Sequence, residues 1–324
     1  MTLVLTVVSQ RYVVQASDRR LTGLDGSLFE DTANKALIYC SFASFALTGL
    51  ATIGNRRTEH LMLSALSQGH DLQEAMAVLG KRATAAFRQL QFPPTVPTHQ
   101  RDVIRRTAFV AGGFQGLRHP ERLGLERTVD DLYPFAAVVS NAHELSGAWR
   151  DRATRDFRQE MRWLPPSENF ILVVSGQPIP SYREGRLRRH IRICIERCEG
   201  SAPLARILAR EIVATAATNP AVGPNVMCTT IPRVHHNEAT VPICSTIQVP
   251  VTTELERFAT SDDALQYPSW IFHPTSLDAQ LHYGPNVAAP GFMLAGTLLG
   301  PTHLVASEEE RRMKAGEFPP KLGP

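Results

Sequence analysis

Thr2 carries a hydroxyl group and follows Met1 directly, so removal of Met1 would give this residue a free α-amine as well. A hydroxyl and an α-amine on one residue form a complete nucleophile and base, because an amine with an ordinary pKa of about 7.7–8.0 accepts the hydroxyl proton near neutral pH. Many chains begin with Met-Thr and make no such use of it. Whether Thr2 can act as a nucleophile therefore depends on the residues around it.

Two further residues are expected near Thr2. Residues 2–8 and 11–17 are rich in β-branched and apolar side chains and are separated by a short turn, which predicts a β-hairpin. A hairpin brings the end of its second strand beside the start of its first, so Asp18 should lie near Thr2. Lys35 begins the next strand and is expected beside Asp18, where its ammonium would lower the pKa of the Thr2 amine and hydroxyl. The alternative is a surface turn at Asp18 and an unrelated exposed lysine.

The order of the predicted elements indicates the fold class. Further strands are predicted at 35–39, 42–48, 106–111, 134–140, 170–174, 226–231 and 241–247, with Gly112-Gly113 and Ser175-Gly176 ending two of them. Apolar residues recur at helical spacing over 51–68, 71–91, 183–198 and 203–217, and the linker 92–101 contains three prolines. Strands and helices thus come in blocks, which favours an α/β (α+β) protein: a four-layer αββα sandwich of two antiparallel sheets.

Four features follow one another at the start of the chain: Thr2, the turn Asp18-Arg19-Arg20-Leu21-Thr22, Lys35 and Gly49. They lie in the segments TLVLTVVSQRYVVQASDRRLTG, ANKALIY and FALTGLATIGN. This pattern resembles the N-terminal half of a proteasome-type β subunit, a family of N-terminal-nucleophile (Ntn) hydrolases. The resemblance implies that Thr2 attacks an amide carbonyl, that Asp18 and Lys35 tune its pKa values, and that the Gly49 N–H holds the oxyanion.

The resemblance also implies supporting residues. Ser175, in the later strand FILVVSGQ, would help to orient the N-terminal amine, and Arg20 would support the site. Thr22 lies in a segment that flanks the site and could bind an extended peptide by strand addition. The chain departs from the family where an Asp and a Ser-Gly-Gly are expected, because Asn219 and Gly223-Pro224-Asn225 stand there.

The implied organisation has two parts. Residues 1–235 form a proteasome-like Ntn-hydrolase domain, and residues 236–324 form a partly irregular C-terminal extension that packs on the core or takes part in assembly. Within the extension, a hairpin is expected at 267–283, where it would cover a sheet edge, and a charged tail at 307–324.

Composition excludes several classes of protein. The net charge of +3 argues against nucleic-acid binding. The arginine-rich stretches, among them the predicted helix that contains Arg183, are therefore interpreted as solvated faces or as subunit contacts with acidic residues such as Asp130 and Asp131. An odd number of cysteines and an N-terminus without a basic region or a membrane-spanning run indicate a cytoplasmic protein with no membrane partner. His190, Cys194 and Cys198 share a helix face but cannot readily supply three tetrahedral ligands, so no metal and no cofactor are expected.

The sequence therefore predicts an N-terminal threonine amide hydrolase, a proteasome-like peptidase that acts by acyl transfer to Thr2 after removal of Met1. The expected substrate is a peptide or a small amide, the expected assembly is a homo-oligomer, and an unfoldase is a candidate partner. Two alternatives stay open. One is a catalytically silent proteasome-like scaffold or regulatory subunit, and the other is an Ntn hydrolase of a small amide.

Overall fold

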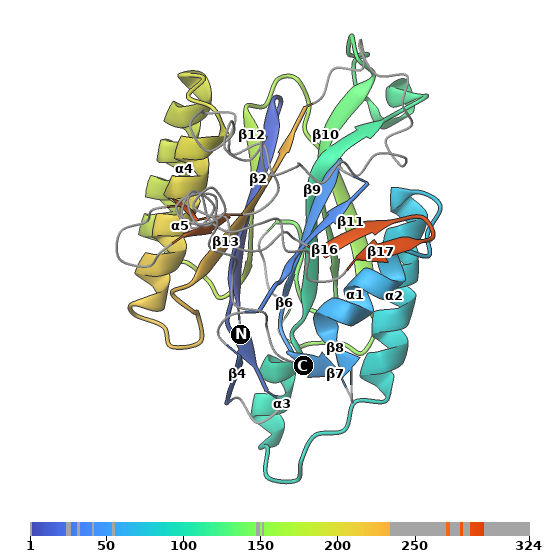
Figure 1. Cartoon of the computed structure of the whole chain (residues 1–324), viewed down its shortest axis with the longest axis vertical. Helices are drawn as coiled ribbons and strands as arrows, with labels where there is room; N and C mark the ends of the chain where they lie inside the picture. The colour runs from blue at the N-terminus through green and yellow to red at the C-terminus, as the bar shows by residue number, and fades with distance from the viewer. Residues whose placement is uncertain are drawn as a thin grey trace, which may run out of the picture.

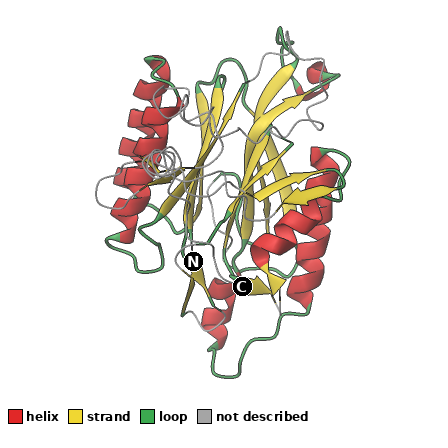
Figure 2. Ribbon diagram, in the orientation of Figure 1, coloured by secondary structure: helices red, strands yellow, loops and turns green. Residues whose placement is uncertain are grey.

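The computed structural model describes residues 2–23, 27–30, 33–40, 42–53, 56–146, 150, 152–233, 270–272, 279–280 and 286–294. These residues form a mixed α+β protein with two large β-sheets and five α-helices (Figure 1). Figure 2 shows the two sheets facing each other, with helices on both outer sides. The predicted succession of strand blocks and helix pairs is confirmed.

The first sheet contains the predicted N-terminal hairpin. Its strands are, in spatial order, β12 (Phe170–Gly176), β1 (Leu3–Ser9), β2 (Tyr12–Asp18), β13 (Val226–Pro232), β14 (Trp270–Phe272) and β15 (Ala279–Gln280). All neighbouring strands are antiparallel. Helices α4 (Ser181–Glu196) and α5 (Ser201–Ala216) pack against one face of this sheet through a shared apolar cluster.

The second sheet carries the other helix pair. Its strands are, in spatial order, β11 (Arg158–Trp163), β10 (Leu132–Ser140), β9 (Ala108–Gly116), β6 (Ala43–Thr48), β5 (Ala36–Tyr39), β16 (Asn286–Ala289) and β17 (Phe292–Leu294). Helices α1 (Thr58–Leu66) and α2 (Leu72–Arg88) cover its outer face. This sheet was expected to be antiparallel throughout, but it is mixed, because β16 runs parallel to β5.

Strand β1 contributes side chains to two different apolar clusters. Its side chains are fully buried along its whole length, as expected for a sheet covered on both faces. Leu3, Leu5 and Val7 point into the cluster shared with α4 and α5, whereas Val4 and Val8 point into the cluster between the two sheets. The period of two along a strand therefore fixes which residues face the second sheet.

One predicted strand end was wrong. Gly112 and Gly113 do not end a strand but lie inside β9, which continues to Gly116. A Cβ atom on Gly112 would lie 2.9 Å from side-chain atoms of Thr6 and Val13 in the facing sheet. Gly112 thus allows close packing against the other sheet, and Gly113 allows close approach of the neighbouring strand β6 at Ala43. The sequence alone does not distinguish this role from strand termination.

Other elements differ from the predicted ones in extent. The predicted helix 51–68 begins only at Thr58, and the preceding residues form a small hairpin of β7 (Thr52–Ile53) and β8 (Arg56–Arg57). A short helix, α3 (Thr98–Arg105), begins inside the proline-rich linker. The arginine-rich residues 150–158 lead into strand β11. The structure also contains the 3₁₀-helix η1 (Pro120–Leu123) and the hairpin of β3 (Leu21–Thr22) and β4 (Leu28–Glu30).

The C-terminal extension adds strands to both sheets. The hairpin expected at 267–283 is confirmed in its described part, where β14 pairs with β15 and extends the edge of β13. Strands β16 and β17 extend the second sheet beyond β5. The strand predicted at 241–247 and the tail at 307–324 lie outside the described residues. In the described part of the chain, no helix is long and apolar enough to cross a membrane.

A polar cluster lies in the otherwise apolar space between the sheets. Gln15 donates from Nε2 to Thr6 Oγ1 (2.9 Å) and to the carbonyl of Val110 (3.0 Å), and its Oε1 accepts from Ser44 Oγ (2.7 Å). Ser44 Oγ lies 2.6 Å from Thr229 Oγ1. Because these buried groups satisfy one another across the two sheets, they fix the relative position of the sheets as well as contributing to stability.

We expect Gln15→Leu to lower the free energy of unfolding by about 2–3 kcal/mol, because the substitution leaves several buried polar groups without a partner. Urea denaturation monitored by circular dichroism measures this loss. Gln159→Leu, on the exposed face of β11, is the matched control and should change stability by less than about 0.5 kcal/mol. Equal stability of both variants would contradict the role assigned to the cluster.

Candidate active site

Thr2 immediately precedes β1 and is fully buried. Its carbonyl oxygen accepts hydrogen bonds from the main-chain N–H of Gln177 (2.9 Å) and from Thr48 Oγ1 (3.3 Å). Gly176 packs against the same carbonyl: its φ is +96°, and a Cβ atom there would lie only 1.7 Å from the Thr2 oxygen. Glycine is therefore required at position 176 both by the backbone conformation and by the close approach of Thr2.

Lys35 reaches the hydroxyl of Thr2. Its Nζ donates to Thr2 Oγ1 at 2.7 Å, donates to the carbonyl of Arg20, and lies 3.4 Å from Asp18 Oδ1. The side chains of Lys35 and Asp18 are completely buried. The structure thus brings together the three side chains that the sequence placed at one site, and the alternative of an exposed, unrelated lysine is wrong.

Asp18 ends β2 and organises the backbone around it. Oδ1 accepts from the N–H of Leu3 (2.9 Å), and Oδ2 accepts from the N–H groups of Arg20 (3.2 Å) and Gly223 (2.9 Å). Burial raises the pKa of the Asp18 carboxyl above its ordinary value, while the Lys35 ammonium and the three N–H donors act in the opposite direction. The carboxylate therefore needs Lys35 as its counter-charge in this buried position.

Arg20 supports the site mainly through its main chain. Its carbonyl oxygen accepts from the Thr2 hydroxyl (3.2 Å) as well as from Lys35. Its guanidinium points away from the hydroxyl and donates to the carbonyls of Pro220 (2.5 Å) and Val222 (3.5 Å). Arg20 thus ties the turn after β2 to the loop after α5.

Gly49 follows β6 and has a φ of +118°. A Cβ atom at this position would lie 2.3 Å from Thr107 Oγ1 and 2.6 Å from the carbonyl oxygen of Arg106. Glycine is therefore required at position 49 by close contact with the residues just before β9 and by a backbone conformation that L-residues rarely adopt.

Ser175 and Thr22 lie in the strands expected for them. Ser175 is buried in β12 opposite Val4, and its hydroxyl has no hydrogen-bond partner within the described part of the chain. Thr22 lies in β3, where its main chain pairs with Leu28 of β4. Ser175 is therefore one residue along β12 from Gly176, the residue that packs against Thr2.

Sequence reasoning missed the residues that hold the carbonyl end of Thr2. Thr48 ends a predicted strand, and Gln177 follows the Ser175-Gly176 pair that ends another one. Nothing in their residue types distinguishes them from ordinary strand termini. Gly223 had been noted only as a departure from the family pattern, yet its N–H donates to Asp18.

Several charged residues outside the site have partners within the chain. Arg183, interpreted as part of a solvated basic face, instead forms a buried ion pair with Glu211 (2.6 Å) that joins α4 to α5. Asp130, suggested as a subunit contact, pairs with Arg233 (2.5 Å). Of the two cysteines that share a predicted helix face with His190, Cys194 is buried and Cys198 is exposed. Among the described residues, no group of three or more metal-ligating side chains is present.

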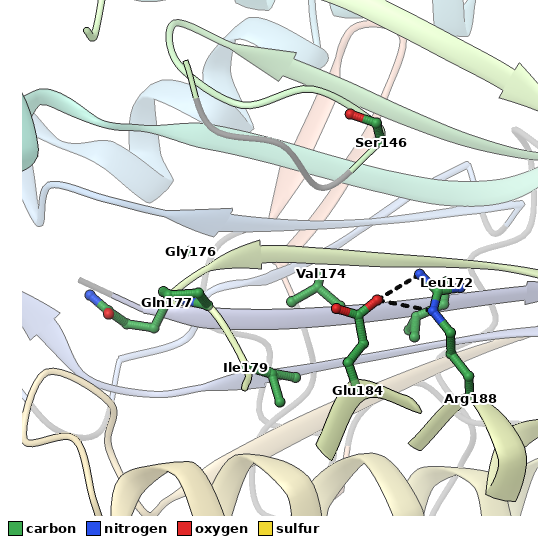
Figure 3. A pocket seen from close by; sticks show the side chains of 9 residues that line it. Ser146, Leu172, Val174, Gly176, Gln177, Ile179, Glu184 and Arg188 are labelled. Carbon is green, nitrogen blue, oxygen red and sulfur yellow. Dashed lines mark hydrogen bonds and ion pairs between the residues drawn. The ribbon is translucent and has the colours of Figure 1, made fainter. Parts of the chain in front are cut away.

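A small cavity of about 110 Å³ lies on the outer side of β12. Figure 3 shows Leu172 and Val174 of β12 facing Glu184 and Arg188 of α4, which form an ion pair at 2.8 Å. Gln177 also lines this cavity, while its main-chain N–H bonds to Thr2. The cavity is therefore separated from Thr2 by the end of a single strand.

Comparison with protein-family models and with curated protein sequences finds no match. Matching solved structures include "Anbu (ancestral beta-subunit)" from Yersinia bercovieri, with 11% identity and a TM-score of 0.41. They also include an Anbu (Gly-1) mutant from Hyphomicrobium sp. strain MC1, with 13% identity and a TM-score of 0.39. Each match covers 72% of this chain and 82% of the other. Similarity at this level leaves the reaction open, so the geometry of the site must carry the functional argument.

We expect Lys35→Met to lower the free energy of unfolding by about 3–5 kcal/mol at neutral pH, because it leaves the Asp18 carboxylate buried without a counter-charge. The double variant Lys35→Met with Asp18→Asn should recover part of this loss, and a double-mutant cycle by urea denaturation measures the coupling. Additive losses from the two single variants would contradict an energetic coupling of the pair.

The pH dependence of Lys35→Met has a defined sign. Burial raises the pKa of Asp18 in the folded protein above the ordinary value of 3.8, and this variant lacks the ammonium that opposes the rise. The folded state then binds more protons than the unfolded state between the two pKa values, so stability should fall as pH rises above about 4. Urea titrations at several pH values measure this slope, which should be smaller when Asp18→Asn is added.

Proposed function

We propose that this protein is an N-terminal threonine amide hydrolase of the proteasome-like Ntn type, with Thr2 as nucleophile after removal of Met1. The observation that carries the proposal is the 2.7 Å hydrogen bond from Lys35 Nζ to Thr2 Oγ1, made in a fully buried site beside Asp18. An ammonium at this distance stabilises the negative charge that develops on the hydroxyl oxygen during attack. Two facing sheets with a helix pair on each outer side support the finer assignment as a four-layer αββα sandwich.

The reaction would proceed by acyl transfer. Thr2 Oγ1 attacks the carbonyl carbon of an amide while its proton passes to the α-amine of the same residue. Collapse of the tetrahedral intermediate breaks the C–N bond, and the proton moves to the departing amine. Water then hydrolyses the ester on Thr2, which releases the acid and restores the hydroxyl. In this scheme the N–H of Gly49 is the proposed oxyanion donor and Ser175 the proposed hydrogen-bond partner of the amine.

The scheme requires that Met1 be removed. Thr2 is completely buried and its nitrogen is bonded to Met1 in the sequence. Removal of Met1 creates the amine that the scheme uses as base. The complete burial of Thr2 favours the second candidate, a catalytically silent scaffold or regulatory subunit, if Met1 stays in place in the working protein.

Labelling by an electrophile tests the proposal. A peptidyl epoxyketone offers two electrophilic carbons that a hydroxyl and an α-amine of one residue can attack in turn, so we expect one adduct on Thr2 in protein that lacks Met1. Intact mass and fragment spectra locate the adduct and show the state of Met1. Thr2→Ala should lose the adduct and the hydrolysis of fluorogenic peptides, whereas Thr2→Ser should retain both. Full hydrolysis by Thr2→Ala at wild-type stability would refute the nucleophile assignment.

We expect catalysis to depend on the positive charge of Lys35. We expect Lys35→Met, assayed near neutral pH at a temperature at which circular dichroism shows the variant folded, to reduce kcat by at least about 100-fold relative to wild type, because the Thr2 hydroxyl oxygen loses the ammonium that stabilises its developing negative charge. Lys81→Met, on the exposed face of α2, is the matched control and should leave kcat unchanged. A folded Lys35→Met variant with wild-type turnover would show that Lys35 has only a structural role.

A further inference from the structure

The carbonyl side of Thr2 is held by a residue whose own side chain is fixed. Gln177 donates its main-chain N–H to the Thr2 carbonyl at 2.9 Å, and its side chain is only 9% exposed. The side-chain oxygen of Gln177 accepts from Asn219 Nδ2 at 3.0 Å. The position of the Thr2 main chain is therefore linked, through one strand end, to the loop that follows α5.

Asn219 fixes that loop in turn. Its Oδ1 accepts from the N–H of Ala221 at 3.0 Å, and its main-chain oxygen accepts from the N–H of Val222 at 3.0 Å. This turn places Gly223, whose N–H donates to Asp18 Oδ2 at 2.9 Å. Asn219 thus lies between the residues that hold the carbonyl of Thr2 and the residue that holds the carboxylate of Asp18.

These contacts close a ring around the reacting group. In order, the ring runs through Thr2, Gln177, Asn219, Gly223, Asp18 and Lys35, and it returns to the Thr2 hydroxyl. The link formed by Gln177 and Asn219 is electrically neutral, whereas Asp18 and Lys35 are the titratable members of the ring. A carboxylate in place of either amide would add a negative charge to this ring and would favour the protonated form of a Thr2 amine.

Building on the proposed function, we propose that Gln177 and Asn219 are positioning residues that hold the Thr2 main chain in register with Asp18, and that their neutrality keeps the Thr2 α-amine free to accept a proton near neutral pH. Neither side chain contacts the Thr2 hydroxyl in the structure, so both act through the main chain of Thr2 and through the Asp18 turn. The proposal concerns the protein that has lost Met1.

Two substitutions at position 219 separate positioning from charge. Asn219→Ala removes both side-chain hydrogen bonds, so we expect kcat to fall by about 10- to 100-fold with KM changed by less than about threefold. Asn219→Asp can keep both bonds if the Gln177 amide turns to donate, so kcat should recover at high pH. Its acid limb in the pH profile should move up by roughly one pH unit, because the added carboxylate stabilises the protonated amine.

The control places the same charge elsewhere. Asn169 directly precedes the other end of β12, is separated from Gln177 by the seven residues of that strand, and is exposed. Asn169→Asp should leave the acid limb and kcat at wild-type values. An unshifted acid limb in Asn219→Asp would overturn the charge argument, and wild-type kcat in Asn219→Ala would overturn the positioning role.

Two measurements without turnover keep this inference distinct from the proposed function. Hydrogen exchange of the Gln177 amide should accelerate in Asn219→Ala and not in Asn169→Ala, and an unchanged exchange rate would overturn the positioning role. Titration of the ¹⁵N-labelled Thr2 amine should show a higher pKa in Asn219→Asp than in wild type, and equal values would overturn the charge argument. If wild-type protein shows no Thr2-dependent hydrolysis, the proposed function fails, and these two readouts still decide for or against the ring.

Discussion

The burial of the Lys35 ammonium is the constraint on which the site depends. A charged amine removed from water is strongly unfavourable unless hydrogen bonds and a counter-charge replace its hydration. Lys35 obtains these from the Thr2 hydroxyl, the Arg20 carbonyl and Asp18. Because Lys35 and these groups come from three different segments, the start of β1, the end of β2 with the turn after it, and the start of β5 must converge on one point. The fold therefore cannot place Lys35 correctly without also placing Thr2.

Close approach of backbone segments makes this convergence feasible. Gly176 lets the end of β12 lie against the Thr2 carbonyl, and Gly49 lets the chain after β6 lie against the start of β9. Between the sheets, Gly112 removes the side chain that would collide with Thr6 and Val13. The site thus lies where strand ends pack against one another, and the apolar clusters on both faces of each sheet hold those ends in place.

Local patterns in the sequence predict the parts of the site that lie on one hairpin. The spacing of β-branched residues placed Asp18 beside Thr2, since a hairpin register follows from its turn. The start of α2 is set just as locally, because Asp71 is a favourable N-cap residue and its side chain accepts from the N–H of Glu74, three residues later. Both features depend on residues close together in the chain, where the backbone itself limits the geometry.

Contacts between distant segments were not predictable in the same way. Nothing in the sequence near Gly223 or Gln177 shows that they bond to Asp18 and Thr2, because these contacts arise only when β12 and the loop after α5 reach the same end of the sheet. The glycines of β9 were misinterpreted for the same reason. A glycine pair has the same sequence signature whether it ends a strand or allows a second sheet to approach, and only the tertiary contact distinguishes the two.

The arrangement of contacts around Thr2 has a consequence for how activity could arise. The carbonyl of Thr2 is held by Gln177 and Thr48, and its hydroxyl is held by Lys35 and Arg20, while Met1 is still part of the sequence. Cleavage of the bond before Thr2 would therefore add an amine to a residue whose other two functional groups already have fixed partners. Little reorganisation is needed after such a step, and a preorganised hydroxyl beside a buried ammonium is the state from which attack on a carbonyl costs least.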